Sequence, residues 1–171
     1  MTSAEHRENA PSNLQISAIT ISDSLSDSEE GKENDKSGKI IKEKLREKDH
    51  KIEYTSIIPD ESKEIRDELQ KSVKNPEIDA VITTGGTGIT SQDKTVDVAK
   101  KIFEKEMPGF GELLRRKSYK EIQTAVILSR STAGIAGKTP IFCLPGSPNS
   151  VKTGMDLIIP DLAHIVKHAR E

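Results

Sequence analysis

Residues 78–83 form a short apolar, β-branched run that leads directly into Gly85-Gly86-Thr87-Gly88. A run that is apolar on both faces is typical of a strand buried in a parallel sheet. Glycines placed directly after such a strand allow a tight turn and let backbone N–H groups face an anion. The hydroxyl groups of Thr84 and Thr87 add donors. The sequence therefore predicts a buried strand that ends in a phosphate-binding loop or, as the alternative, in a plain tight turn.

The rest of the chain alternates between strand-like and helix-like patterns. Strands are expected at residues 14–21, 52–58, 78–83, 124–128 and 139–144. Helices are expected at 37–50, around 65–73, at 92–106, around 110–114 and at 149–168, where Pro160 should kink or split the helix. Residues 22–37 are expected to form a long polar loop that is either solvated or closes over a ligand. This alternation predicts a single α/β domain over residues 14–171, a three-layer α/β/α arrangement with a Rossmann-like, mostly parallel sheet, preceded by a flexible polar tail at residues 1–13.

The composition argues against several classes of protein. Lys and Arg total 26 against 28 Asp and Glu, and there is no Trp, so neither the basic surface nor the stacking platform of a nucleic-acid binder is expected. No apolar stretch is long enough to span a membrane. Cys143 is the one cysteine and lies in an apolar run, which predicts a reduced core thiol and a cytoplasmic protein.

Two carboxylates follow expected strands. Ligands of parallel α/β sheets bind at the carboxyl ends of the strands, so Asp60, after the strand at 52–58, and Asp93, after the glycine-rich loop, are expected on the binding edge. Two acids beside a polyphosphate can hold Mg²⁺. The alternative is that both are helix N-terminal residues without a ligand.

Two further segments follow expected strands. Pro145-Gly146-Ser147 sets a rigid turn, and Ser147 or Asn149 could either cap the last helix or bind a ligand. Ser129-Arg130-Ser131 places an arginine between two hydroxyls, which suits a phosphate, although a surface ion pair is an equal alternative.

Taken together, these motifs resemble the MoaB/MogA family of molybdopterin-binding proteins. The residues that carry the resemblance, spread over about residues 14–168, are Ile19-Thr20-Ile21-Ser22-Asp23, Asp35-Lys36-Ser37-Gly38, Ile58-Pro59-Asp60-Glu61, Thr83 to Gly88 with Asp93, Glu106-Met107-Pro108-Gly109-Phe110-Gly111-Glu112, Leu128-Ser129-Arg130-Ser131 and Leu144-Pro145-Gly146-Ser147-Pro148-Asn149. Residues 89–93 lack the proline and basic residues common in MogA-type enzymes, so the chain is more similar to MoaB.

The resemblance implies adenylyl transfer from Mg-ATP to molybdopterin during molybdenum or tungsten cofactor biosynthesis, with pyrophosphate as the second product. It also implies a trimer or hexamer, a metal-insertion partner of the MoeA type and no tightly bound cofactor. A non-catalytic molybdopterin-binding or carrier protein of the same fold is the alternative.

The resemblance also assigns roles to individual residues. Asp93 and Asp60 would be catalytic and would hold the Mg²⁺ of ATP. The pterin and nucleotide would be bound by Asp35, Ser37, Gly38, Thr84, Gly85, Gly86, Thr87, Gly88, Ser129, Arg130, Ser131, Pro145, Gly146 and Ser147.

Overall fold

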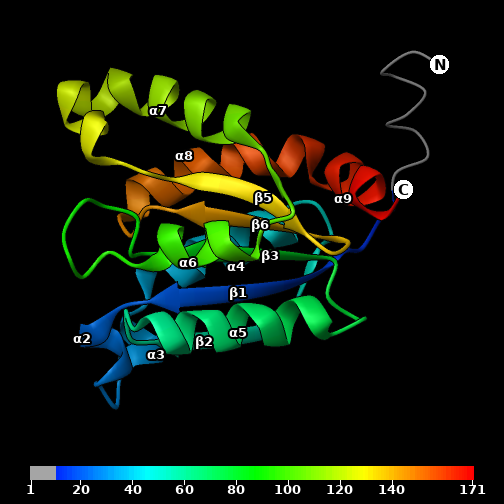
Figure 1. Cartoon of the computed structure of the whole chain (residues 1–171), viewed down its shortest axis with the longest axis horizontal. Helices are drawn as coiled ribbons and strands as arrows, with labels where there is room; N and C mark the ends of the chain where they lie inside the picture. The colour runs from blue at the N-terminus through cyan, green and yellow to red at the C-terminus, as the bar shows by residue number, and fades with distance from the viewer. Residues whose placement is uncertain (1–10) are drawn as a thin grey trace.

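A single mixed sheet forms the centre of the molecule in the computed structural model, which describes residues 11–171 (Figure 1). Within that range its six strands are ordered β2-β1-β3-β6-β5-β4. They are β1 (Gln15–Ile21), β2 (Lys51–Ile58), β3 (Ala80–Thr84), β4 (Lys105–Glu106), β5 (Thr132–Ala136) and β6 (Thr139–Leu144). Most of the predicted N-terminal tail, residues 1–10, lies outside the described residues.

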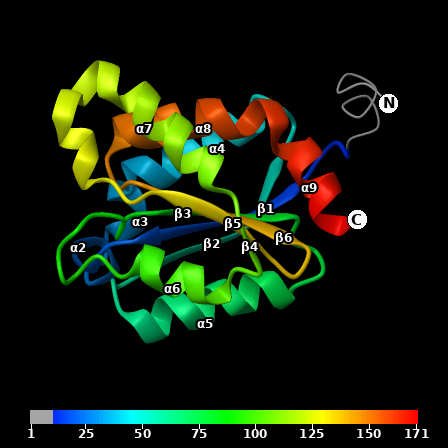
Figure 2. The same cartoon turned by 45° about the horizontal axis from the view of Figure 1, so that its top comes forward.

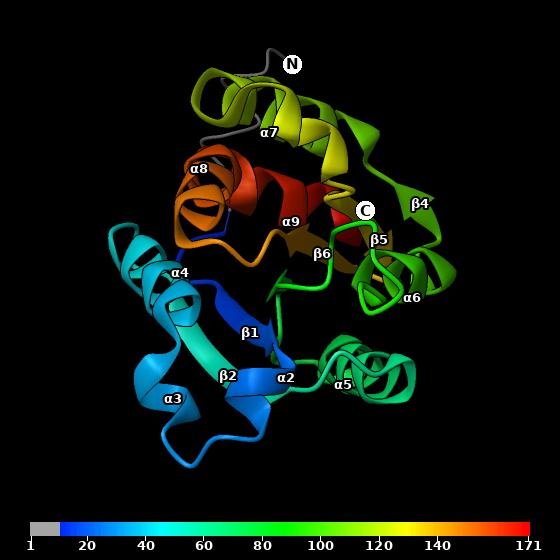
Figure 3. The ribbon, with the colours of Figure 1, turned by 90° about the vertical axis from the view of Figure 1, so that its left-hand side faces the viewer.

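The strands β2, β1, β3 and β6 run parallel to one another. β5 is antiparallel to its neighbour β6, and β4 is antiparallel to β5, so β4 runs in the same direction as the first four strands. Thr84 pairs with Thr20 of β1 and with Leu144 of β6, so the carboxyl ends of three strands lie side by side. Figure 3 shows the molecule from this edge, where the loops after β1, β3 and β6 meet. The predicted mostly parallel sheet is confirmed.

Helices cover both faces of the sheet and give the three-layer arrangement (Figure 2). On one face, the core contains side chains of α4 (Lys36–Arg46), α7 (Pro108–Ile122), α8 (Pro148–Ile158) and α9 (Leu162–Arg170). On the other, it contains side chains of α5 (Ser62–Lys74) and α6 (Thr95–Ile102). In the described part of the chain, no helix combines the length and apolar character required to cross a membrane.

The predicted strand at 124–128 is wrong. Residues Gln123–Leu128 form a 3₁₀ helix, η1, and Ile127 is 75% exposed. The neighbouring strand is β5, whose Thr-Ala-Gly-Ile-Ala sequence has glycine at its centre and two alanines. Gly134 lies directly against the ring of Phe103, so a small residue is required where a strong strand former would normally stand.

Several predicted boundaries also change. Residues 22–37 contain two short helices, α2 (Asp23–Ser26) and α3 (Gly31–Asn34), instead of a continuous loop. The helix predicted to reach residue 106 ends at Ile102, and α7 is longer than expected despite Gly109 and Gly111. The predicted break at Pro160 is confirmed by the 3₁₀ turn η2 (Ile159–Asp161) between α8 and α9.

Cys143 lies fully buried in β6, as its apolar neighbours predicted. Burial raises the pKa of its thiol to about 11, partly opposed by a hydrogen bond with Thr83. The thiol is therefore protonated at neutral pH and serves as a small core side chain.

Candidate functional site

The glycine-rich loop begins where β3 ends and is packed between its two neighbouring strands. Gly85 has a φ of +103° and Gly86 a φ of +63°, values that an L side chain rarely adopts. The amide of Gly85 donates to the carbonyl oxygen of Leu144 at 3.0 Å. A Cβ on Gly85 would overlap the carbonyl oxygen of Ile21, so the turn depends on glycine for space as well as for conformation.

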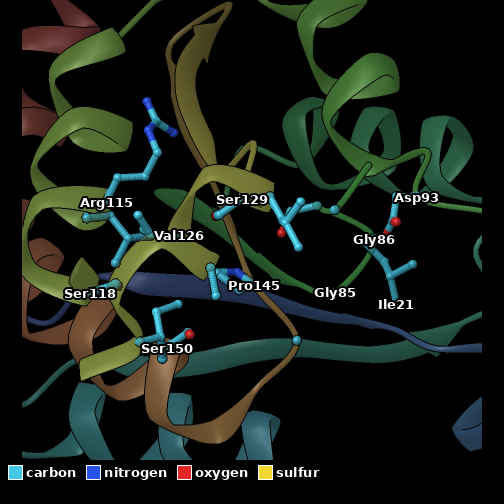
Figure 4. A pocket seen from close by; sticks show the side chains of 17 residues that line it. Ile21, Gly85, Gly86, Asp93, Arg115, Ser118, Val126, Ser129, Pro145 and Ser150 are labelled. Carbon is cyan, nitrogen blue, oxygen red and sulfur yellow. The ribbon is translucent and has the colours of Figure 1, made fainter. Parts of the chain in front are cut away.

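A pocket of about 430 Å³ lies over this loop (Figure 4). One wall is backbone-rich and contains Gly85 to Gly88, Pro145 and Gly146, with Asp93 at its end. The opposite wall belongs to the end of α7 and to η1, and it is mostly apolar: Leu114, Ile122, Ala125, Val126 and Leu128, with Arg115, Ser118 and Ser129 beside them. The pocket therefore has backbone amides and a carboxylate on one side and an apolar surface on the other.

A second hollow, of about 270 Å³, adjoins the pocket and shares Ile21 and Gly146 with it. Asp35 borders this hollow and caps α4: its Oδ1 accepts from the amide of Gly38 at 2.8 Å, and its Oδ2 from Thr20 Oγ1 at 2.6 Å. Ser37 donates to the carbonyl oxygen of Gly146 at 2.9 Å. These predicted binding residues thus tie α4 to β1 and to the turn after β6.

Thr84 and Ser147 fix the same turn. The hydroxyl of Thr84 donates to the carbonyl oxygen of Pro145 at 2.8 Å. Ser147 is the N-cap of α8, with its Oγ accepting from the amide of Ser150. Both hydroxyls have partners within the protein, so the turn keeps its shape without a ligand.

Asp93 lines the pocket and is held by Thr90, whose amide and hydroxyl donate to its Oδ2 at 2.9 and 2.7 Å. Partial burial acts to raise the pKa of Asp93. The hydrogen bonds from Thr90 and Gly88 and the charge of Arg130 outweigh it, so the pKa is lowered. Asp93 is consequently ionised at neutral pH.

Asp60 lies beneath the loop, where a Cβ on Gly86 would be 2.5 Å from its Oδ2. Its Oδ1 accepts from the amide of Lys94 at 3.1 Å, and its own amide donates to Asp23 Oδ1 at 2.8 Å. Burial raises the pKa of Asp60; the Lys94 amide opposes this, and the charges of Asp93 and Asp23 add to it. Of these three carboxylates, Asp93 lines the pocket, and Asp60 and Asp23 do not.

This arrangement predicts that Asp60→Asn stabilises the protein. Because the pKa of Asp60 is raised in the folded state, its carboxyl favours folding below its ordinary value of 3.8 and opposes folding once pH rises through the raised pKa. Thermal denaturation at pH 7 should show a Tm increase on the order of 2 °C that disappears toward about pH 3. Asp67→Asn is a control of opposite sign, because a hydrogen bond from Lys63 lowers the pKa of Asp67. A lower Tm for Asp60→Asn at pH 7 would mean that the ionised carboxylate is stabilising.

Arg130 faces inward from the segment between η1 and β5. Its guanidinium pairs with Asp97 at 2.9 Å and also donates to the carbonyl oxygens of Gly88 and Asp93. The ion pair that the sequence left as an alternative is therefore present. Ser129 lines the pocket and donates to Ser131 Oγ at 3.2 Å, and Ser131 is almost completely buried.

Sequence reasoning missed several residues of the site. Asp97 and Arg115 contact the segment of Arg130 and Ser131, and Thr90 holds Asp93. The apolar wall was missed because η1 was predicted to be a strand. The spacing of Thr90 and Asp93, a side-chain turn at i and i+3, was a signal that could have identified the first of these contacts.

Comparisons with known proteins agree with this geometry. Residues 17–164 match the family described as "Probable molybdopterin binding domain". The chain is 42% identical to "Molybdenum cofactor biosynthesis protein B" of Bacillus subtilis, over 100% of this chain and 99% of that protein. It is 43% identical to "Molybdopterin adenylyltransferase" of Pyrococcus furiosus, over 98% of each.

A solved structure gives the same result. The fold matches the crystal structure titled "tungsten cofactor synthesizing protein MoaB from Pyrococcus furiosus" with a TM-score of 0.84 and 42% identity, over 95% of this chain and 100% of that one. Because the family match and these relatives span nearly the whole chain, the protein belongs to the MoaB/MogA family of molybdopterin-binding domains.

Proposed function

We propose that this protein transfers an adenylyl group from Mg-ATP to molybdopterin in the biosynthesis of a molybdenum or tungsten cofactor. A terminal phosphate oxygen of the pterin attacks the α-phosphorus of ATP, and a new P–O bond forms. The bond between the α-phosphorus and the oxygen bridging to the β-phosphate breaks. Adenylylated molybdopterin and pyrophosphate are the products, so atoms and charge balance without a further reactant.

The observation that carries this proposal is the two-sided pocket over the glycine-rich loop. The amide of Gly85 donates to Leu144 and that of Gly88 to Asp93, so the N–H groups suited to phosphate oxygens are those of Gly86 and Thr87. The apolar wall of α7 and η1 suits a flat heterocycle such as a pterin or an adenine. Asp93 lies at the end of the loop, across the pocket from Arg115, Ser118 and Val126, and we place the reacting phosphates on this side (Figure 4).

Both reactants are anions, so their mutual repulsion is the main barrier that the site must lower. The attacking phosphate is already ionised at neutral pH, so the reaction needs no general base. Fixed amides offset part of the negative charge, and binding both phosphates in one pocket supplies the alignment.

Mg²⁺ fits the carboxylates of this site as a companion of ATP. The described residues contain no group of three or more His, Cys, Asp or Glu side chains that could hold a metal ion. Mg²⁺ commonly binds through one or two carboxylates, substrate phosphates and water. Asp93 accepts from Thr90 and from the amide of Gly88, and Asp60 accepts from the amide of Lys94. Two carboxylate oxygens have about four lone pairs, so these hydrogen bonds leave acceptor sites for the ion. Bound there, Mg²⁺ would neutralise phosphate charge.

The proposed function also implies a partner protein, a cellular compartment and an oligomeric state. The product is an activated pterin, which a metal-insertion protein of the MoeA type would accept. We place the reaction in the cytoplasm and expect the protein to assemble as a trimer or hexamer, in keeping with the family resemblance of the motifs.

The test is a turnover assay with purified protein, molybdopterin and Mg-ATP, in which pyrophosphate and adenylylated pterin are both measured. We expect the two products in equal amounts and only when both substrates are present. Tight pterin binding without either product would overturn the transferase proposal and assign the protein to the carrier class.

A further inference from the structure

The guanidinium of Arg130 is engaged on three sides by the protein. Its Nε donates to the carbonyl oxygen of Gly88 at 2.6 Å, and its Nη2 to that of Asp93 at 2.9 Å. Asp97 accepts from Nη1 at 2.9 Å and from Nη2 at 3.0 Å. These four hydrogen bonds leave the guanidinium little freedom to turn toward a ligand.

The two carbonyl oxygens that Arg130 binds are the ends of the loop that carries Asp93. Within this loop, the turn is closed by Thr90, which holds one oxygen of the Asp93 carboxylate. The loop is otherwise open to solvent at its tip, where Ile89 is 62% exposed. Arg130 therefore holds the two ends of the loop in place, and Thr90 fixes the orientation of the Asp93 carboxylate within it.

Asp97 anchors this arrangement to a helix. It lies in the first turn of α6, where an acidic side chain also interacts favourably with the helix dipole. Its carboxylate is half-exposed but is paired with two N–H groups of Arg130. The pair neutralises much of the charge that a phosphate would require from Arg130.

We propose that Arg130 and Asp97 are positioning residues that hold the 88–93 loop so that Asp93 faces the pocket, and that Arg130 does not bind the phosphate of the substrate. This inference rests on the proposed transferase function, because it assigns the pair a role through Asp93. Arg130 could either position the loop or bind a ligand. These two roles predict different changes in kcat and KM when Asp97 is substituted.

Asp97→Asn is the decisive variant. If Arg130 positions the loop, losing the carboxylate loosens Asp93, and kcat should fall about 10-fold while KM for ATP and for molybdopterin stays within about 2-fold. If Arg130 instead binds phosphate, the variant frees its guanidinium, so KM should fall and kcat should be kept. That second result would overturn the proposal.

Arg130→Lys gives an independent measurement. Lysine keeps the charge, but its single nitrogen cannot reproduce four hydrogen bonds made from three separate guanidinium nitrogens, so we expect kcat to fall about 100-fold. Hydrogen–deuterium exchange of the amides of residues 88–94 in the ligand-free protein should become faster in both variants. The ligand-free protein is used so that any change in exchange comes from the loop itself and not from a bound ligand. Unchanged exchange would therefore contradict a positioning role.

Lys100→Gln is the matched control, because it removes an ion pair with Glu106 from the same helix without touching the loop. Its kcat and its exchange at residues 88–94 should equal those of the wild type. If wild-type protein shows no turnover, the proposed function fails, and the exchange experiment alone then decides whether Arg130 and Asp97 hold the loop.

Discussion

Asp93→Asn is expected to reduce adenylyl transfer by at least about 100-fold and to leave the affinity for molybdopterin within about 3-fold of the wild type. The amide keeps the size of the side chain and can still accept from Thr90, so the loop should retain its conformation. What is lost is the negative charge that the lowered pKa maintains at neutral pH. The measurement is steady-state turnover with calorimetric titration of the pterin.

The control for this variant is Gln92→Ala. Gln92 is next to Asp93 in the same exposed loop, and its hydrogen bond to Thr90 comes from its backbone, which the change retains. We expect its turnover to be unchanged. Transfer by Asp93→Asn at the wild-type rate would remove Asp93 from the reaction.

Gly85→Ala is expected to lower stability by about 2–4 kcal/mol, or roughly 5–15 °C in Tm, and to abolish ligand binding. The φ of +103° strains any L side chain, and the new methyl group would overlap the carbonyl oxygen of Ile21 in β1. That oxygen belongs to the backbone of a central strand and cannot swing away. The loop must therefore move, and the amide wall of the pocket moves with it. Thermal denaturation and pterin titration check both effects.

Gly109→Ala provides the matched control. Gly109 lies in the first turn of α7, and no atom is within 4 Å of the Cβ that it would gain. Alanine favours a helix over glycine, so we expect Tm to stay the same or to rise slightly. A loss of stability equal to that of Gly85→Ala would show that the cost is not specific to the turn after β3.

The parallel core of the fold follows from sequence patterns, whereas the region between α7 and β5 does not. Residues 78–83 read as a buried strand because both of their faces are apolar, and β3 confirms this. An apolar run does not by itself distinguish a strand from a helical turn, so residues 124–128 were misread. The true strand, β5, has a glycine at its centre because Phe103 occupies the space above Gly134, and this contact exists only in the folded protein.

The candidate site also contains some residues that sequence patterns predict and others that only the folded structure brings together. Asp60 and Asp93 were identified because they follow strands, and their strand ends lie at one edge of the sheet. The pairing of Arg130 with Asp97 could not be identified, because these residues are brought together by the packing of α6 beside the segment before β5. A guanidinium between two hydroxyls suits a phosphate and a carboxylate equally well, so its partner depends on tertiary structure.

The two outer strands of the sheet have a consequence for the behaviour of the protein at high concentration. β4 has only two residues, both charged and exposed, and the outer strand β2 carries exposed Lys51 and Glu53 on one face. Short or charged edges discourage strands of another molecule from adding to a sheet. Edge-to-edge pairing of the described sheet is therefore disfavoured at both ends, which favours helix and loop surfaces over a continued sheet as the contacts of an ordered assembly.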